Sequence, residues 1–539
     1  MAAEEAQTVV PPGMETFTVG LIGMGDMGRM YAIRLAAAGW SDSKSFDRTR
    51  GRRAYSDQWT KKIRQHTDRR QIRKSPRRIF WKSTATQPFP LLQPLHSACQ
   101  GKRRRDDFVC DFGPTVNSKL RSHAEELSQE NIIILRNGHL VSRASDYIIY
   151  SVEAAAIGHV VKEYGPFVSF PTLVPYLADS AAFFVSKLLF LRSETATKQG
   201  AIVGGQTSCK DPEIKALESF LPEDVQIVSC HSLHGPSVDT HGQPLVLIKH
   251  RATDEAFAKV ETVLRCLGST HVYLTAEMHD RITADTQAVT HVAFLSMGKA
   301  WHASQQFPWE GARYVGGIEN VKINLMLRIY AQKWHVYAGL AIMNPEARRQ
   351  IAQYAASTTE LYKLMLEGRA DELRKRVYHA RDKVFGTDGH PMWEEKPMLD
   401  DGLLDGFGLG ERPEHILPNN HLSLLAMVDC WSELGIVPYD HMLCSTPLFR
   451  LRLGVAESVF RDTAKLDETL RVAIEDNTFR SDDLEFTFAA RGWAECVSLG
   501  HFETWKERFV VTQNFFKPRF PEATKVGNAM MKALLDSRK

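Results

Sequence analysis

The chain has 539 residues, of which 43% are hydrophobic and 24% are charged, and its formal net charge is +3. This length exceeds what one hydrophobic core can organise and predicts two or three domains. The nearly balanced charge gives no general case for a nucleic-acid or membrane partner. The eight cysteines form no C-x-x-C pair, so we expect reduced thiols, a cytoplasmic setting and no metal site.

The first predicted element is a strand at residues 17–22 that leads into a glycine-rich turn. Residues 1–16 carry acidic residues and no apolar signal segment, so we expect a disordered tail there. A helical pattern, RMYAIRLAAAGW, follows the turn. A strand, G-x-G-x-x-G and a helix in this order are typical of a dinucleotide-binding Rossmann domain. We therefore expect cofactor contacts from the six residues of the turn: Gly23, Met24, Gly25, Asp26, Met27 and Gly28.

The residue that contacts the ribose is expected at the end of the next strand, about 20 residues further on. Asp47 and Arg48 stand at this distance. Asp47 alone would accept a hydrogen bond from a free ribose hydroxyl and favours NAD, whereas Arg48 would pair with the additional phosphate of NADP. The residues leave the choice between the two cofactors open.

Two segments interrupt the α/β pattern, near residues 49–119 and 167–195. The first is densely basic, which would also suit a nucleic-acid-binding tail. We interpret it as a surface insertion, because strands resume after it. The second is apolar but contains charged residues, and a charge at a bilayer centre costs roughly 3 kcal/mol, so we do not predict a membrane span. Whether both segments belong to the working protein stays open.

Ligands bind at the carboxyl ends of parallel strands, and polar residues follow two further predicted strands. Ser151 and Glu153 end the run SDYIIYSVEA, so we expect them near the cofactor. His231 and His234 follow the strand predicted at residues 225–230. A histidine at this edge can accept or donate a proton near neutral pH. A turn histidine that only bonds the backbone is the alternative.

From residue 276 onward the pattern is helical. We expect one helical domain at 276–385, a loop at 386–419 and a second helical domain at 420–539. The runs that begin at His291 and His421 share His, Leu, Met and Trp at the same four offsets, which predicts a duplicated helical domain. The predicted fold is an α/β Rossmann-type domain at 17–275 followed by an all-α region.

Seven runs, taken in order, resemble the fungal prephenate dehydrogenases of tyrosine biosynthesis. They are GLIGMGDMG, SDYIIYSVEA, IVGGQTSCK, HSLHGP, HDRITADTQAVTHVAFLSMG, NVKINLMLRIYAQKWHVYAGLAIMNP and PYDHMLCSTPLFRLRLGV. The resemblance implies an NADP-linked oxidative decarboxylation of prephenate to 4-hydroxyphenylpyruvate. We expect no nucleic-acid or membrane partner, and a homodimer through the helical domains.

The resemblance also implies roles for single residues. The histidine that opens an H-x-x-x-G-P turn, here His231, accepts the proton of the ring hydroxyl. Ser208 in the run TSCK hydrogen-bonds near that hydroxyl.

The two carboxylates of prephenate require a cationic side chain, for which a bidentate arginine is best suited. The run STPLFR matches a bacterial substrate-binding motif and ends at Arg450, but the later arginine of that motif falls on Ser458. Arg328 and Lys333 are therefore further candidates. We also expect Gln287 to line the substrate site.

Three other functions stay open on sequence grounds. Arogenate differs from prephenate only by an amine in place of the keto group. A β-hydroxyacid dehydrogenase shares the GLIGMGDMG opening but would lack the HSLHGP turn. A nucleotide-binding protein inactivated by its insertions is the third alternative.

Overall fold

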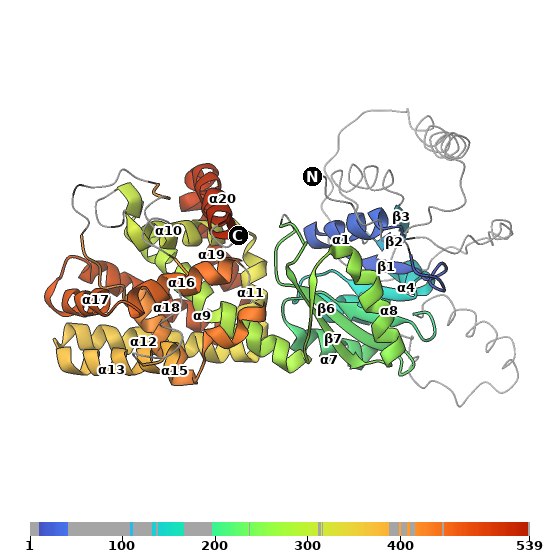
Figure 1. The fold of residues 1–539 in the computed structure, drawn as a ribbon, viewed down its shortest axis with the longest axis horizontal. Coiled ribbons are helices and arrows are strands. Elements are labelled where there is room, and N and C mark those ends of the chain that lie inside the picture. The colour runs from blue at the N-terminus through green and yellow to red at the C-terminus, as the bar shows by residue number, and fades with distance from the viewer. Residues whose placement is uncertain are drawn as a thin grey trace, which may run out of the picture.

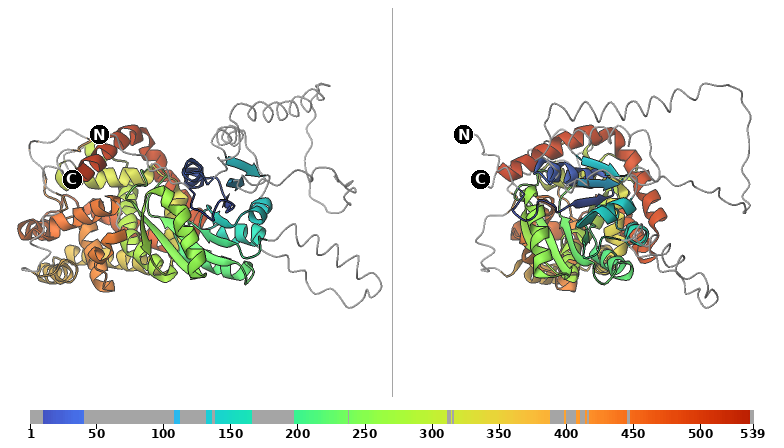
Figure 2. Two further views of the ribbon diagram at one scale, coloured as in Figure 1. Left: turned by 45° about the vertical axis from the view of Figure 1, so that its right-hand side comes forward. Right: turned by 90° about the vertical axis from the view of Figure 1, so that its right-hand side faces the viewer.

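An eight-stranded sheet forms the first part of the structure and helices form the second (Figure 1). The computed structural model describes residues 10–40, 108–111, 132–135, 138–165, 197–236, 238–310, 314, 316–387, 398–399, 407–409, 414, 417–444 and 447–536. The predicted sites Asp47 and Arg48, the tail at 1–9 and most of both predicted insertions lie outside these residues. The two views of Figure 2 show the same division into a sheet and a helical part.

The sheet has the strand order β3-β2-β1-β4-β5-β6-β7-β8, in which only the β6–β7 pair is antiparallel. Its first six strands have the order of a Rossmann sheet. The strands are β1 (Val19–Ile22), β2 (Phe108–Asp111), β3 (Ile132–Leu135), β4 (Tyr147–Tyr150), β5 (Ile202–Gly205), β6 (Gln226–Ser232), β7 (Pro244–Arg251) and β8 (Thr270–Tyr273).

Helices cover both faces of this sheet, which explains why β1, β4 and β5 are short runs with every residue buried. On one face, α1 (Asp26–Ala37) and α8 (Asp254–Leu264) complete one hydrophobic cluster. On the other, α4 (Gly138–Ala144), α5 (Ile157–Tyr164) and α7 (Lys210–Phe220) complete a second.

The strand beside β1 corrects the predicted chain path. β2 pairs in parallel with β1 and lies inside the range that we expected to be an insertion, so at least these four residues belong to the sheet. The signal was weak because the strand has only four residues and directly follows the basic run KRRRDD. The position that should contact the ribose, at the end of this strand, is therefore Asp111.

The second part of the chain is helical, as predicted. Its α-helices are α9 (Ala276–Ala303), α10 (Gly317–Tyr330), α11 (Trp334–Met343), α12 (Pro345–Leu366), α13 (Ala370–Phe385), α15 (Leu422–Leu434), α16 (Pro447–Phe460), α17 (Thr463–Glu475), α18 (Arg480–Ser498), α19 (Phe502–Phe516) and α20 (Phe520–Asp536). The short 3-10 segments are η1 (Arg265–Leu267), η2 (Pro308–Glu310), η5 (Pro438–Cys444) and η6 (Lys517–Arg519).

The helices on both sides of the predicted loop share one hydrophobic cluster. It contains Val292 and Ile351 from before the loop and Leu425, Val455 and Trp493 from after it. Helix α12 contacts α9, α15 and α18, so it joins the two halves. The structure thus shows one helical core where we predicted two separate domains.

Two helices connect this core to the sheet. Helix α9 begins next to α7 of the α/β domain and extends through the helical core (Figure 1). Helix α11 lies on the side of the helical domain that faces the sheet, where Gly339 approaches Ala154. No helix in the described part of the chain is both long and apolar enough to cross a bilayer.

Candidate active site

The three glycines of the turn after β1 meet three different spatial requirements. Gly23 has a φ of +101°, and a Cβ there would lie 2.3 Å from the carbonyl oxygen of Ser151. A Cβ on Gly28 would lie 2.2 Å from the carbonyl oxygen of Gly23. A Cβ on Gly25, in contrast, would meet no atom within 4 Å, so the space above this residue is open. A tight turn, close helix–strand packing and an open approach are what a bound pyrophosphate requires.

The start of α1 is suited to an anion. Gly25 is its N-cap and offers no side-chain acceptor, so the first amide groups of the helix are available to a phosphate. Asp26 would repel a phosphate, but Lys333 Nζ lies 2.6 Å from its carboxylate. Met24 and Met27 pack against the hydrophobic cluster on the α1 side of the sheet. Of these predicted cofactor residues, the two methionines therefore offer mainly backbone.

The loop after β4 forms the neighbouring wall. The Ser151 amide donates to the carbonyl of Ile22 at 2.7 Å, which holds Ser151 against the glycine turn. Glu153 is exposed, and its carboxylate lies 3.3 Å from Nδ1 of His335. The first turn of α11 therefore contacts both cofactor loops, through Lys333 and through His335. The predicted substrate residue Lys333 is placed on the cofactor side.

His231 takes part in a chain of three side chains that spans the two domains. Strand β6 continues to Ser232, so His231 is the penultimate strand residue and not a turn residue as predicted. Its Nδ1 lies 2.7 Å from Nε2 of His279, the fourth residue of α9. Nδ1 of His279 in turn lies 2.9 Å from the carboxylate of Asp280. We name this set, His231, His279 and Asp280, the histidine relay.

Asp280 is held by the N-terminus of α7. Its carboxylate accepts the backbone amide hydrogens of Lys210 at 2.7 Å and Asp211 at 2.8 Å. Burial alone would raise the pKa of Asp280, but the hydrogen bonds from His279 and from the two amides lower it overall. Asp280 is therefore an anion at neutral pH.

This anion determines where the protons of the relay lie. An ionised Asp280 requires a proton on Nδ1 of His279, so Nε2 of His279 must accept from Nδ1 of His231. Nε2 of His231 is then an unprotonated nitrogen, and it has no hydrogen-bond partner among the described residues. Burial, followed by the neighbouring His279 and Lys210, lowers the pKa of His231 well below its usual value. His231 is thus neutral and able to accept a proton.

A buried ion pair holds the strand that carries His231. Lys210 Nζ lies 3.0 Å from Glu213 and donates to the carbonyl of Cys230 at 2.8 Å. The lysine is completely buried, so an unpaired charge there would be costly and the geometry is well determined.

The two other predicted polar residues flank this arrangement. Ser208 is half-buried in the turn between β5 and α7, next to Cys209, whose thiol lies 3.5 Å from Asp280. No contact between Ser208 and His231 is present. Gln287 is half-buried on α9, about two turns beyond His279.

Farther along α9 the structure gathers cationic and aromatic side chains. The ring of His291 packs edge-on against Tyr337 of α11, with centroids 4.8 Å apart. Arg452 of α16 is 5% exposed, and burial lowers its pKa to about 10. Its charge lowers the pKa of His291 and acts on Tyr337, and Arg328 also acts on Tyr337. These groups therefore form one neighbourhood.

Arg452 is unusual because nothing neutralises it. No carboxylate lies within 4 Å of it in the described ranges, and its Nε is buried without a hydrogen-bond partner. An isolated buried charge costs several kcal/mol, so it persists only where a function requires it. The two predicted arginines are half-buried: Arg328 donates to Asn528 at 3.2 Å, and Arg450 lies one half-turn before Arg452.

Sequence reasoning missed His279, Asp280 and Arg452. The pair His279-Asp280 comes directly after the start of α9 and could have been noticed as a base and an acid at a domain junction. Arg452 stands two residues after Arg450, in the run RLR, and only burial distinguishes the two. Among the described residues no group of three or more potential metal ligands is present.

The fold and the site together define a dehydrogenase class: a Rossmann-type domain that binds a dinucleotide, closed by a helical domain that contributes to the catalytic residues. Comparison with known proteins narrows this class. A family model of the 6-phosphogluconate dehydrogenase C-terminal domain, in the form typical of tyrosine-pathway dehydrogenases, matches residues 288–536.

Two curated relatives match most of the chain. It is 45% identical over 524 residues to the "Probable prephenate dehydrogenase (NADP(+))" of Schizosaccharomyces pombe, covering 97% of this chain and 99% of that protein. It is 48% identical over 423 residues to the "Prephenate dehydrogenase (NADP(+))" of Saccharomyces cerevisiae, covering 76% and 85%. A crystal structure of prephenate dehydrogenase from A. aeolicus matches with 16% identity and a TM-score of 0.38, covering 67% of this chain and 94% of that chain.

The chain therefore belongs to the fungal family of NADP-dependent prephenate dehydrogenases. This confirms the resemblance that the sequence runs indicated.

Proposed function

We propose that this protein oxidises and decarboxylates prephenate to 4-hydroxyphenylpyruvate with NADP, as a step of tyrosine biosynthesis. The observation that carries the proposal is the histidine relay, which presents an unprotonated Nε2 of His231 at the carboxyl edge of a Rossmann sheet. Family membership supplies the substrate and the cofactor.

The cofactor would be held by the glycine turn and the loop after β4. Gly23, Gly25 and Gly28 leave room for the pyrophosphate, and the first amides of α1 bind it. Ser151 and Glu153 form the adjacent wall. When bound, NADP accepts the hydride that leaves the ring carbinol carbon.

We assign the ribose-contacting position to Asp111, the last residue of β2, because this is where dinucleotide-binding domains carry that residue. The expectation for Asp47 and Arg48 came from a strand assignment that the sheet order replaces.

His231 would act first as a base and then as an acid. Its Nε2 accepts the proton of the ring hydroxyl while hydride leaves the same carbon. The ring carboxylate then departs as carbon dioxide, and its bonding electrons complete the aromatic ring. The resulting phenolate takes a proton back from His231. Base catalysis of this kind is worth about 10²–10⁴-fold. Ser208, in the neighbouring turn, is proposed to orient the hydroxyl.

The charges developed on His231 would be shared by the relay. The proton on its Nδ1 faces Nε2 of His279, and the Asp280 anion stabilises the positive charge on the pair. Thus His279 and Asp280 are positioning residues that act through His231.

The dianionic substrate would be held by the cationic neighbourhood of α10 and α16. We propose that Arg452 pairs with a substrate carboxylate, because its buried guanidinium otherwise lacks an anion. Arg328 and Arg450 would supply further positive charge, and Gln287 would line the path between this region and His231. Lys333 is reassigned to the cofactor phosphates.

The helical domain carries two further proposals. The echo between α9 and α15 supports an origin by duplication, since both helices contact α12 within one core. We also propose the homodimer through this domain, which light scattering of the purified protein would test.

The proposed activity is tested by absorbance at 340 nm after prephenate is added to the protein with NADP, with NAD, or with neither. We expect NADP reduction that depends on prephenate, together with formation of 4-hydroxyphenylpyruvate. The same assay with arogenate should give much slower reduction. A protein that binds NADP but reduces none in the presence of prephenate would contradict the proposal.

A further inference from the structure

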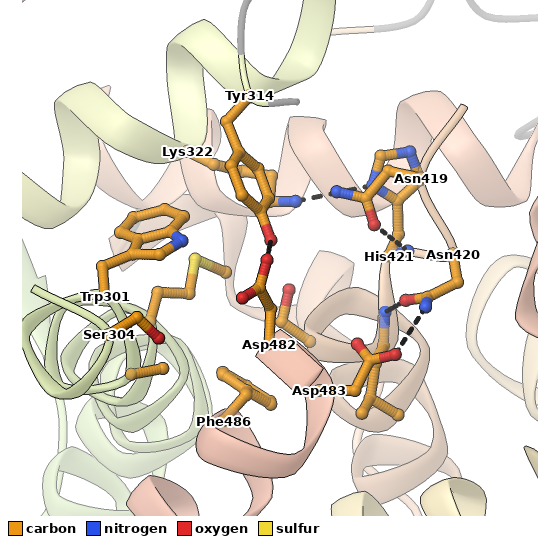
Figure 3. A pocket seen from close by; sticks show the side chains of 14 residues that line it. Trp301, Ser304, Tyr314, Lys322, Asn419, Asn420, His421, Asp482, Asp483 and Phe486 are labelled. Atoms are coloured by element: carbon orange, nitrogen blue, oxygen red, sulfur yellow. Dashed lines mark hydrogen bonds between the residues drawn. The ribbon is translucent and has the colours of Figure 1, made fainter. Parts of the chain in front are cut away.

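A second cavity lies at the far end of α9, inside the helical domain (Figure 3). It has about 470 Å³ of empty space, part of it open to solvent, between the last turns of α9, the turn before α15, and the start of α18. Ligand pockets for small molecules have volumes of about 300–1,000 Å³, so the space is sufficient for a molecule of single-ring size.

The cavity is separate from the dehydrogenase site. Trp301 lines it, whereas His279 of the histidine relay lies 22 residues earlier on the same helix. At 1.5 Å per residue this separation is roughly 33 Å along the axis of α9. A ligand of single-ring size cannot reach both places.

One part of its wall is aromatic. Trp301, Tyr314 and Phe486 face the space together (Figure 3). Trp301 is only 5% exposed, and its indole nitrogen points into the cavity without a hydrogen-bond partner among the described residues. A buried indole N–H normally has a partner, so its absence points to a missing ligand atom.

The positive charge of the wall is already neutralised. Lys322 Nζ lies 2.8 Å from Glu319, and both side chains are buried. Burial, with the nearby Lys322, lowers the pKa of His421, so this histidine stays neutral at pH 7. The cavity therefore offers no free cation to an anionic ligand.

The opposite wall carries two carboxylates, and Asp483 is not neutralised in the same way. Asp482 accepts from the hydroxyl of Tyr314 at 2.7 Å, and Asp483 accepts from the amide of Asn420 at 2.7 Å (Figure 3). Asp483 is 7% exposed, and no lysine or arginine of the described residues pairs with it. Burial raises its pKa to about 7, which reflects the missing cation.

We propose that this cavity is a binding site for a small amine, in which an ammonium group pairs with Asp483 and an aromatic or apolar body packs on Trp301 and Phe486. Such a body would gain from burial at roughly 25 cal/mol per Å², and the aromatic faces also attract the cation. The inference is independent of the dehydrogenase activity.

The test is calorimetric titration of the full-length protein with phenethylamine, and with 2-phenylethanol as a neutral molecule of the same shape. We expect one site per chain for the amine and at least tenfold weaker binding of the alcohol. Binding of the amine should strengthen between pH 6 and pH 8, as Asp483 ionises.

Two variants locate the site. Asp483→Asn should weaken amine binding at least tenfold, and Ala300→Leu should abolish it by filling the space, since Ala300 lines the cavity. Asp476→Asn, an exposed aspartate outside the cavity, is the matched control and should bind normally. Equal binding of amine and alcohol, absence of amine binding, or full affinity in both cavity variants would overturn the proposal. Turnover of prephenate is expected to be normal whichever result is obtained, so the two proposals fail separately.

Discussion

At the scale of single residues, the site depends on groups whose charge is fixed by their neighbours. Asp280 is an anion because two backbone amides and His279 donate to it, and His231 is neutral because it is buried beside His279. The same reasoning identifies Arg452 as a cation without a partner. Each statement has a consequence for a substitution at that residue.

Replacing His279 tests whether the relay acts on His231. In His279→Asn we expect kcat to fall about 10- to 100-fold, with an unchanged dissociation constant for NADP. Because His279 contributes to the low pKa of His231, its removal should raise that pKa. The acid limb of the profile of kcat/KM against pH should therefore move to higher pH. A loss of thermal stability with no movement of this limb would show that His279 is only structural.

Replacing Arg452 separates stability from substrate binding. In Arg452→Met we expect the free energy of unfolding to rise by roughly 1–4 kcal/mol, because an unpaired buried charge is removed. The KM for prephenate should rise about 10- to 100-fold, the equivalent of one charge-assisted hydrogen bond.

Arg461, just beyond the end of α16, is the matched control. Its guanidinium pairs with the buried Glu457 at 2.5 Å, so Arg461→Met should destabilise the protein by roughly 3–5 kcal/mol. If Arg452→Met is also less stable and its KM is unchanged, then Arg452 is a structural residue.

At the scale of elements, the turn between β1 and α1 assigns different tasks to glycines that look alike in the sequence. Gly28 is required by packing, because a Cβ would press on the backbone of Gly23. Gly25 is surrounded by open space, so packing does not require it.

Substitution by alanine therefore separates the two tasks. Gly25→Ala should leave the midpoint of thermal unfolding nearly unchanged and should weaken the binding of NADP clearly, because the added methyl group occupies the approach of the pyrophosphate. Gly28→Ala should also lower the unfolding midpoint. Fluorescence titration with NADPH and a thermal melt measure both effects. Unchanged NADPH binding in Gly25→Ala would contradict the proposed position of the pyrophosphate.

At the scale of the whole molecule, α9 and α11 place residues of the helical domain against the α/β domain. The histidine relay joins β6 to α9, and the pairs Lys333–Asp26 and His335–Glu153 join α11 to the cofactor loops. Neither domain holds a complete site by itself.

Lys333→Ala tests this contact. The pair with Asp26 is exposed, and such pairs contribute at most about 1 kcal/mol to stability, so the unfolding midpoint should hardly change. The dissociation constant for NADP should rise several-fold, because Asp26 then faces the phosphates without a counter-charge. Lys363→Ala, which breaks the exposed pair with Glu360, is the control and should leave NADP binding intact. Equal NADP affinity in both variants would remove Lys333 from the cofactor site.

The sequence predicted those features that are written in local order. The glycine turn, the strand before His231 and the helical character after residue 276 each depend on neighbours in the chain. The strand at Phe108–Asp111 was missed because its register is set by β1, which lies far earlier in the chain.

Long-range contacts also explain the other differences. The partner of His231 is 48 residues away, and the isolation of Arg452 depends on what other helices do not bring near it. The single helical core follows from α12 packing on helices from both sides of the loop, which no local pattern reveals. Lys333 was assigned to the substrate because its pair with Asp26 joins positions 307 residues apart.

The central claim is that Nε2 of His231 removes the hydroxyl proton of the substrate. It is tested most directly by His231→Asn, with kcat measured at saturating prephenate and NADP, and NADP binding measured by titration. We predict that kcat falls by about 10²–10⁴-fold while the dissociation constant for NADP stays nearly the same. Unchanged turnover in this variant would contradict the claim.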